Sequence, residues 1–134
     1  MEKQEIIISR DLADSLAQAL DRQSYDRLFV LTDTTTHRLC RPLLSGMKGM
    51  DDARDIVIEP TDEHKDLHSL ASVWTALQEG GATRHSLMIN LGGGMVTDLG
   101  GFAASTFKRG IPYINIPTTL LSMVDASVGG KTGI

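Results

Sequence analysis

Short apolar runs recur along the chain, separated by stretches in which apolar residues follow helical spacing. The runs predict strands over residues 5–9, 27–32, 55–58, 86–91 and 113–116. The second run is continuously apolar, which is typical of a parallel strand covered on both faces. Each run is too short for a helix and is bounded by polar, glycine or proline residues, as strands usually are.

The stretches between these runs predict helices over residues 11–20, from 33 to about 40, 65–79 and 95–107. The threonine-rich sequence after Asp33 suits a helix N-cap. In the third helix, one apolar stripe is expected from Leu67, Leu70, Ala71, Trp74 and Leu77. Gly80 and Gly81 then supply the signal that ends this helix.

Alternation of strand and helix predicts an α/β fold with a Rossmann-like parallel sheet and helices on both faces. The length of 134 residues suits one domain. Ligands of such sheets bind beyond the carboxyl ends of the strands. Polar and glycine residues gather at these ends: Asp33, residues 59–62, residues 92–94 and residues 117–119. We therefore expect one ligand-binding edge.

Three consecutive glycines, Gly92, Gly93 and Gly94, follow the fourth predicted strand. Glycine permits positive φ and lets another molecule approach the backbone closely. The helix that begins there would offer free N–H groups to a pyrophosphate. We expect Asp98 in its first turn, where it either stabilises the helix dipole or contacts a ribose or nicotinamide amide. Gly100 and Gly101 lie inside the same helix, which indicates close backbone packing because interior glycine costs roughly 1 kcal/mol relative to alanine.

Two nucleotide-binding patterns fit only in part. The pattern G-x-G-x-x-G fails at Thr97, and no acidic ribose ligand follows about 20 residues later. The sequence Gly130-Lys131-Thr132 resembles the end of a P-loop, but Asp125 occupies the position of its first glycine. For the turn at residues 92–94, three interpretations stay open: a standard Rossmann turn, a plain tight turn and a phosphate-binding turn of another type. The last is favoured.

Other candidates have two readings each. Asp125 is an isolated carboxylate among small and apolar residues, so it is either paired or functional. Lys131 is either a surface lysine or a cation presented by a glycine turn. His64 and His68 have the spacing of two metal ligands on one helix face, but no third ligand is evident nearby, so a solvated face is favoured.

Composition narrows the class of protein. The net charge of −4 argues against a nucleic-acid or anionic-membrane surface. No apolar run approaches the length of about 18 residues that a membrane span needs, and no signal peptide opens the chain. Cys40 is the single cysteine, which excludes an internal disulfide and indicates a reducing compartment. We expect a soluble cytoplasmic protein.

The segments GGGMVTDLGGF, RGI, IPTTLL and VDASVGGKTG occur in that order within residues 91–134. In motif, order and spacing this stretch resembles the 3-dehydroquinate synthases, which are sugar-phosphate cyclases. The resemblance implies the NAD-binding N-terminal domain of a two-domain enzyme. That enzyme would convert 3-deoxy-D-arabino-heptulosonate 7-phosphate to 3-dehydroquinate and phosphate, and would form a homodimer.

The resemblance also assigns roles to residues. Asp33 matches the position that holds the adenosine ribose. Asp62 and Lys65 match a cofactor motif, although Thr61 replaces its glycine, Asp62 shortens its glutamate, and Thr35 replaces an asparagine common near Asp33. Further NAD contacts are implied for Gly93, Gly94, Met95, Val96, Thr97, Asp98, Thr118 and Thr119.

The resemblance also implies that three residues contact the substrate. Asp125 and Lys131 match catalytic, substrate-facing positions, and Lys131 would also lie near the nicotinamide. Arg109 matches an arginine that reaches the substrate phosphate of the other subunit. The divalent metal, zinc or cobalt, is held in the family by a glutamate and two histidines of a later helical domain, so we expect no metal ligand in this chain.

The chain ends at Ile134, before that helical domain would begin. We therefore expect the N-terminal part of a longer enzyme, with little or no activity by itself. Two alternatives stay open: another sugar-phosphate cyclase, and a nucleotide-binding module without catalysis.

Overall fold

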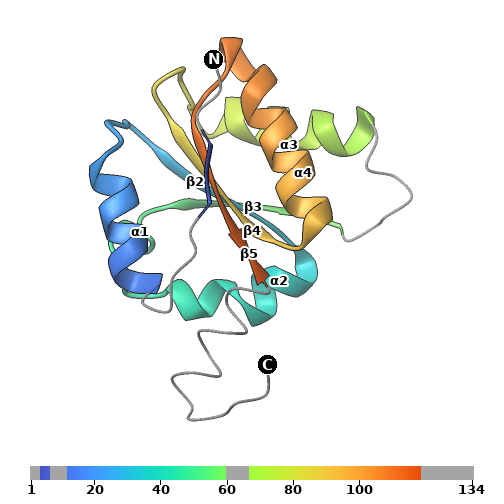
Figure 1. The fold of residues 1–134 in the computed structure, drawn as a ribbon. Coiled ribbons are helices and arrows are strands. Elements are labelled where there is room, and N and C mark those ends of the chain that lie inside the picture. The colour runs from blue at the N-terminus through green and yellow to red at the C-terminus, as the bar shows by residue number, and fades with distance from the viewer. Residues whose placement is uncertain (1–3, 7–11, 60–66, 119–134) are drawn as a thin grey trace.

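The computed structural model describes residues 4–6, 12–59 and 67–118 of the chain (Figure 1). The strands are β1 (Gln4–Ile6), β2 (Leu28–Asp33), β3 (Arg54–Ile58), β4 (Leu87–Gly92) and β5 (Tyr113–Pro117). The helices are α1 (Leu12–Asp21), α2 (Thr34–Leu39), α3 (Leu67–Glu79) and α4 (Gly94–Thr106). Two short 3₁₀ helices are η1 (Arg41–Leu44) and η2 (Phe107–Arg109).

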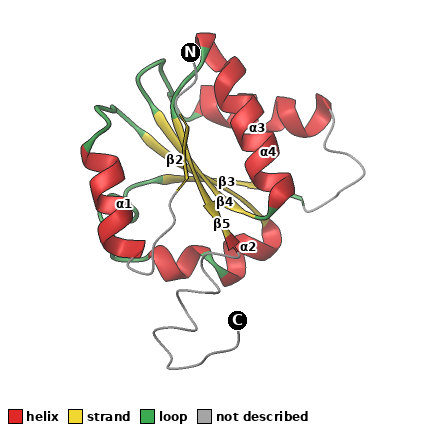
Figure 2. Ribbon diagram, viewed as in Figure 1, coloured by secondary structure: helices red, strands yellow, loops and turns green. Residues whose placement is uncertain are grey.

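The strands form one sheet in the order β1-β5-β4-β2-β3, and every pair is parallel. Helix α1 and the α2–η1 segment cover one face of this sheet, while α3 and α4 cover the other (Figure 2). The predicted α/β fold with helices on both faces is confirmed. The order of the strands is new information, because sequence patterns mark strands but not their neighbours.

The core lies in two layers that the pleat of the strands separates. Val30 packs with the α1 side of the sheet, whereas the next residue, Leu31, packs with the α3–α4 side. All six residues of β4 are buried, as expected for a central parallel strand covered on both faces. The first five residues of β2 are buried as well, which confirms the covering on both faces predicted from its continuously apolar run.

The apolar stripe predicted for α3 is partly wrong. The buried residues of the helix are Leu70, Val73 and Leu77. Leu67 is 77% exposed, and Ala71 is exposed as well. Trp74 lies at the edge of the contact, where its indole N–H donates to Thr106 Oγ1 of α4 over 3.2 Å. The helix is rotated so that Val73 and not Ala71 faces the sheet.

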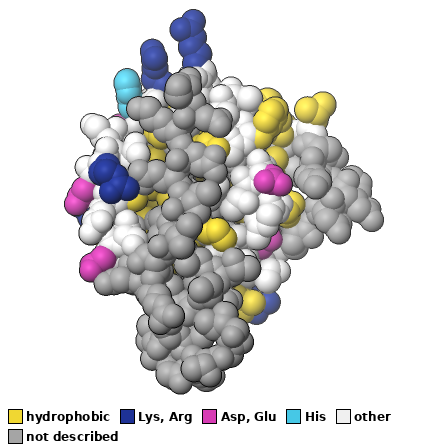
Figure 3. Space-filling model, in the orientation of Figure 1, with side chains coloured by type: hydrophobic (Ala, Val, Ile, Leu, Met, Phe, Trp, Pro, Cys, Tyr) yellow, Lys and Arg dark blue, Asp and Glu magenta, His cyan; other side chains and the backbone are white. Residues whose placement is uncertain are grey.

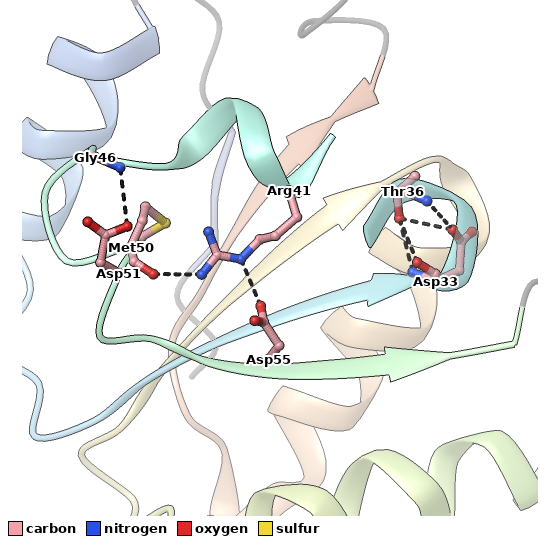
Figure 4. Close-up of polar contacts among 7 residues, drawn as sticks. All are labelled: Asp33, Thr36, Arg41, Gly46, Met50, Asp51 and Asp55. Carbon is pink, nitrogen blue, oxygen red and sulfur yellow. Dashed lines mark hydrogen bonds and ion pairs between the residues drawn. The ribbon is translucent and has the colours of Figure 1, made fainter. Parts of the chain in front are cut away.

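The connection between α2 and β3 is held by Arg41, which the sequence reading did not single out. Its Nε donates to Asp55 Oδ1 over 2.7 Å, and a terminal guanidinium nitrogen donates to the Met50 carbonyl over 2.6 Å (Figure 4). The N–H of Gly46 donates to Asp51 Oδ1 within the same loop. These bonds fix the segment from Arg41 to Asp51 against the edge strand β3.

Helix α4 lies unusually close to the sheet, as its two interior glycines predicted. A Cβ atom on Gly100 would lie 2.0 Å from Asn90 Oδ1 of β4. A Cβ atom on Gly101 would lie 3.2 Å from the Tyr113 hydroxyl oxygen of β5. The glycine pair therefore sets the height of α4 above β4 and β5, and with it the position of the helix start.

Candidate functional site

The chain changes its direction of winding between the neighbouring strands β2 and β4, and we refer to the region beyond the carboxyl ends of these two strands as the crevice. After β2 the chain passes to α2 on one face, and after the neighbouring β4 it passes to α4 on the other (Figure 1). Such a switch point opens a crevice at the carboxyl ends of the strands, where ligands of open α/β sheets bind. Leu31 and Asn90 are register partners, so Asp33 and Gly92, two residues further on, end their strands at the same level.

The three glycines in the turn after β4 are subject to different structural constraints. Gly92 is required by packing, since a Cβ there would lie 2.7 Å from the Cβ of Val96. Gly93 and Gly94 are exposed, and a Cβ on either would meet nothing within 4 Å. None of the three has positive φ. Within the described residues, neither positive φ nor packing requires glycine at positions 93 and 94, and the absence of side chains there leaves room for close approach by another molecule.

The N-terminus of α4 supplies donors at this turn. The first helical bond runs from the N–H of Thr97 to the carbonyl of Gly93 over 3.0 Å. The N–H groups of Gly94, Met95 and Val96 come before it and have no acceptor within the helix. No side chain caps Gly93. These N–H groups and the helix dipole favour an anion. Because the Val96 side chain is fully buried, Val96 can contribute only its backbone.

Thr97 and Asp98 border a groove of about 350 Å³ beside α4, together with Asn115 of β5. The hydroxyl of Thr97 donates to the carbonyls of Gly93 and Gly94, so it closes the first helical turn. Asp98 is exposed. It lies outside the first turn of α4, which corrects the expectation from the sequence, because the helix begins at Gly94. The helix dipole therefore gives little reason for a carboxylate at Asp98, because its effect falls off beyond the first turn.

Asp33 lies on the opposite side of the crevice as the N-cap of α2. Its Oδ1 accepts from the N–H of Thr36 over 2.7 Å and from the Thr36 hydroxyl over 2.9 Å (Figure 4). Its own N–H donates to Thr36 Oγ1, which completes a capping box. The carboxylate is therefore held in one orientation at the level of the glycine turn. Burial, together with the charge of Asp33, raises the pKa of the Cys40 thiol.

A buried amide pair lies beneath α4, and the sequence reading missed it. Asn90 Nδ2 donates to Asn115 Oδ1 over 3.0 Å, and the two residues are register partners in β4 and β5. Asn90 Oδ1 is buried without a partner. One signal could have revealed the pair, because each asparagine stands two residues before the end of an otherwise apolar strand.

Arg109 lies far from the glycine turn. Helix α4 has 13 residues, so its two ends are separated by about 20 Å at about 1.5 Å per residue. Arg109 follows the far end in a turn where Lys108 (φ 46°), Arg109 (φ 72°) and Gly110 (φ 103°) are all left-handed. Arg109 is exposed, and because it precedes β5 it lies at the edge where the strands begin. The structure does not bring it to the crevice of its own chain.

Thr118 directly follows β5, and its neighbour Pro117 is the register partner of Gly92, so Thr118 lies beside the glycine turn. The remaining candidate residues, Asp62, Lys65, Thr119, Asp125 and Lys131, lie outside the described residues, as does His64. His68 is exposed on α3. Within residues 4–6, 12–59 and 67–118, no three His, Cys, Asp or Glu side chains are grouped to hold a metal ion.

Residues 55–134 match the family model described as the N-terminal part of 3-dehydroquinate synthase. The chain belongs to the 3-dehydroquinate synthase family. It is 52% identical over its whole length to the 3-dehydroquinate synthase of Parabacteroides distasonis and 46% identical over 120 residues to that of Thermococcus kodakarensis. It spans 38% and 34% of the lengths of these two relatives.

Solved structures support the same fold. The 2-epi-5-epi-valiolone synthase ValA of Streptomyces hygroscopicus, solved with NAD⁺ and Zn²⁺ bound, is 32% identical with a TM-score of 0.69. The match covers 92% of this chain and 35% of ValA. A 2-deoxy-scyllo-inosose synthase, at 19% identity and a TM-score of 0.64 over 86% of this chain and 32% of its own, shows the fold alone. None of the helices in the described part of the chain is long and apolar enough to span a membrane.

Proposed function

We propose that this chain is the NAD-binding part of a 3-dehydroquinate synthase. The complete enzyme would convert 3-deoxy-D-arabino-heptulosonate 7-phosphate to 3-dehydroquinate and phosphate in the shikimate pathway. The observation that carries this proposal is the turn at Gly93 and Gly94. It lies at the switch point of the sheet, ends in free helix N–H groups, and has open space where side chains would stand.

The described residues fit a dinucleotide across the crevice. The N–H groups of Gly94, Met95 and Val96 would bind the pyrophosphate. Asp33 would hold the adenosine ribose on the α2 side, while Asp98 and Thr118 would lie on the nicotinamide side. The capping box keeps the Asp33 carboxylate in place before the cofactor arrives, which lowers the entropic cost of binding. Bound NAD would supply a reversible hydride acceptor.

Asp62, Lys65, Thr119, Asp125 and Lys131 keep the roles that the family resemblance assigns to them. Asp125 and Lys131 would face the sugar phosphate, and Lys131 would also approach the nicotinamide. By the family resemblance, zinc or cobalt would be held by a glutamate and two histidines of a later helical domain. The single cysteine supports a reducing, cytoplasmic location for the enzyme.

A homodimer would explain the position of Arg109. About 20 Å separate it from the glycine turn of its own chain, which is too far for one sugar phosphate to contact both. An arginine presented at the opposite edge of the domain can instead reach the active site of a second copy. We therefore propose that Arg109 binds the phosphate of a substrate held by the partner subunit.

A second cyclase activity has one observation in its favour, the 32% identity to ValA. Both functions can be tested by supplying the complete enzyme with NAD⁺, a divalent metal and a series of sugar phosphates. Release of inorganic phosphate with formation of 3-dehydroquinate from the heptulosonate phosphate supports the synthase. Turnover of another sugar phosphate, with the heptulosonate phosphate inert, would show that the assigned substrate is wrong.

A further inference from the structure

A second concave site lies at the edge of the sheet where the strands begin, away from the crevice. Three loops form it, and they precede the adjacent strands β2, β4 and β5. The cavity measures about 480 Å³. It is lined by Arg22, Gln23, Ser24, Arg84, His85, Gly110, Ile111 and Pro112. We refer to it as the basic cleft.

Backbone hydrogen bonds hold the walls of the basic cleft in place. The N–H of Asp26 donates to the carbonyl of His85 over 3.1 Å, which ties the loop before β2 to the loop before β4. The N–H of Met88 donates to the carbonyl of Pro112, also over 3.1 Å, and ties β4 to the loop before β5. The backbone of the cleft walls is therefore held in place by the fold.

The ionisable side chains that line the cleft are two arginines and a histidine, Arg22, Arg84 and His85. Among the described residues that line the cleft there is no carboxylate, although the whole chain has a net charge of −4. Lys108 and Arg109 directly precede Gly110, which lines the cleft. In Figure 3, Lys and Arg side chains and one histidine stand together at the upper end of the molecule, with no acidic side chain visible among them.

The two carboxylates that flank the loop before β2, Asp21 and Asp26, are engaged elsewhere. Asp21, which precedes Arg22, forms an ion pair with Lys48. Asp26 accepts hydrogen bonds from the hydroxyls of Thr83 and Ser86, and it lines a different cavity, together with Arg27 and Arg54. By contrast, the side-chain nitrogens of Arg84 and His85 make no hydrogen bond or ion pair in the described part of the chain. Their donors are therefore available to a ligand.

We propose that the basic cleft binds a phosphate dianion, either inorganic phosphate or the phosphate group of a phosphate monoester. Guanidinium groups present planar pairs of N–H donors that match phosphate oxygens, and charge-assisted bonds of this kind are the strong ones. The imidazole of His85 adds a ring N–H donor. This site is about one helix length from the glycine turn, and it depends on neither NAD nor catalysis.

The proposal is tested by equilibrium dialysis of the complete protein against radiolabelled inorganic phosphate at constant ionic strength. Constant ionic strength removes the general screening effect of added salt. The double variant Arg84→Gln, His85→Gln should lose one bound phosphate per chain, with affinity at that site reduced about tenfold or more. Circular dichroism of the variant establishes that it is folded.

Arg38→Gln is the matched control. It removes one positive charge from exposed α2, at the opposite edge of the sheet, and should leave the phosphate count unchanged. Competition with a hexose 6-phosphate separates the two sources of the dianion. Displacement identifies a phosphate monoester as a ligand, and its absence identifies free phosphate. Equal phosphate binding by the wild type and the double variant overturns the proposal.

Discussion

The side-chain oxygen of Asn90 occupies the space that a Cβ atom on Gly100 would need, 2.0 Å from that position. Asn90 in turn donates to Asn115 across the β4–β5 pair. The Asn90 side chain therefore contacts α4 on one side and β5 on the other, and it links both elements to β4. This contact sets where α4 begins, and hence where the N–H groups of the glycine turn lie.

Replacement of Gly100 by alanine should destabilise the domain by about 2 kcal/mol. Overpacking destabilises the fold by about 1–3 kcal/mol, and loss of the Asn90–Asn115 hydrogen bond by about 1 kcal/mol. The higher helix propensity of alanine offsets about 1 kcal/mol of this loss. Urea unfolding measures the difference. Gly101→Ala is the control, because its Cβ would lie at 3.2 Å from the nearest side-chain atom, and its loss should be clearly smaller. Equal losses at both positions would show that the Asn90 contact is not the cause.

The hydrogen bonds of Asp26 predict a pH dependence of stability. The hydroxyls of Thr83 and Ser86 donate to this carboxylate and lower its pKa below the ordinary value. A carboxylate with a lowered folded-state pKa stabilises the fold at pH values above its unfolded-state pKa. That contribution is lost as the pH falls below about 4 and through the folded-state pKa.

The Asp26→Asn variant isolates this effect, because its amide does not titrate. Thermal unfolding should show the wild type to be more stable than the variant at neutral pH. The difference should shrink as the pH is lowered below about 4. If the stability difference between the wild type and Asp26→Asn stays constant on acidification, the ionised Asp26 carboxylate does not stabilise the fold through these hydrogen bonds.

The proposed role of Arg109 predicts complementation between subunits. Arg109→Ala and Lys131→Ala should each impair turnover, and Lys131 is proposed to act within its own subunit. If Arg109 serves the partner, a mixed dimer contains one intact site, so random exchange should restore about a quarter of wild-type activity. Steady-state assays before and after exchange measure this recovery. No recovery in verified mixed dimers would place Arg109 in its own active site.

Much of the fold was predictable because its signals are local. The apolar run ending at Leu91 reflects a strand buried on both faces, and Asp33 before a threonine run gave the N-cap of α2. Element boundaries differ from expectation by one or two residues in most cases. One such shift matters, because the start of α4 at Gly94 moves Asp98 out of the first turn.

Other features depended on information that one sequence does not contain. The pairing of Asn90 with Asn115 requires β4 and β5 to be neighbours in register, and strand order is not visible in residue patterns. The exposure of Leu67 follows from the rotation of α3 against α4. By contrast, the helix predicted over residues 95–107 already implied the separation of Arg109 from the glycine turn.

The central claim is that Gly93 and Gly94 are glycines because NAD approaches their backbone. Isothermal titration of the complete enzyme with NAD⁺ tests it, using Gly94→Ala and, as control, Ala71→Val on the exposed face of α3. A Cβ on Gly94 meets no atom of the chain within 4 Å, so the variant should keep its stability within about 0.5 kcal/mol. Its NAD⁺ affinity should fall about tenfold or more, while the control binds like the wild type. Unchanged NAD⁺ affinity in a folded Gly94→Ala enzyme, or no NAD⁺ binding by the wild type, would contradict the account.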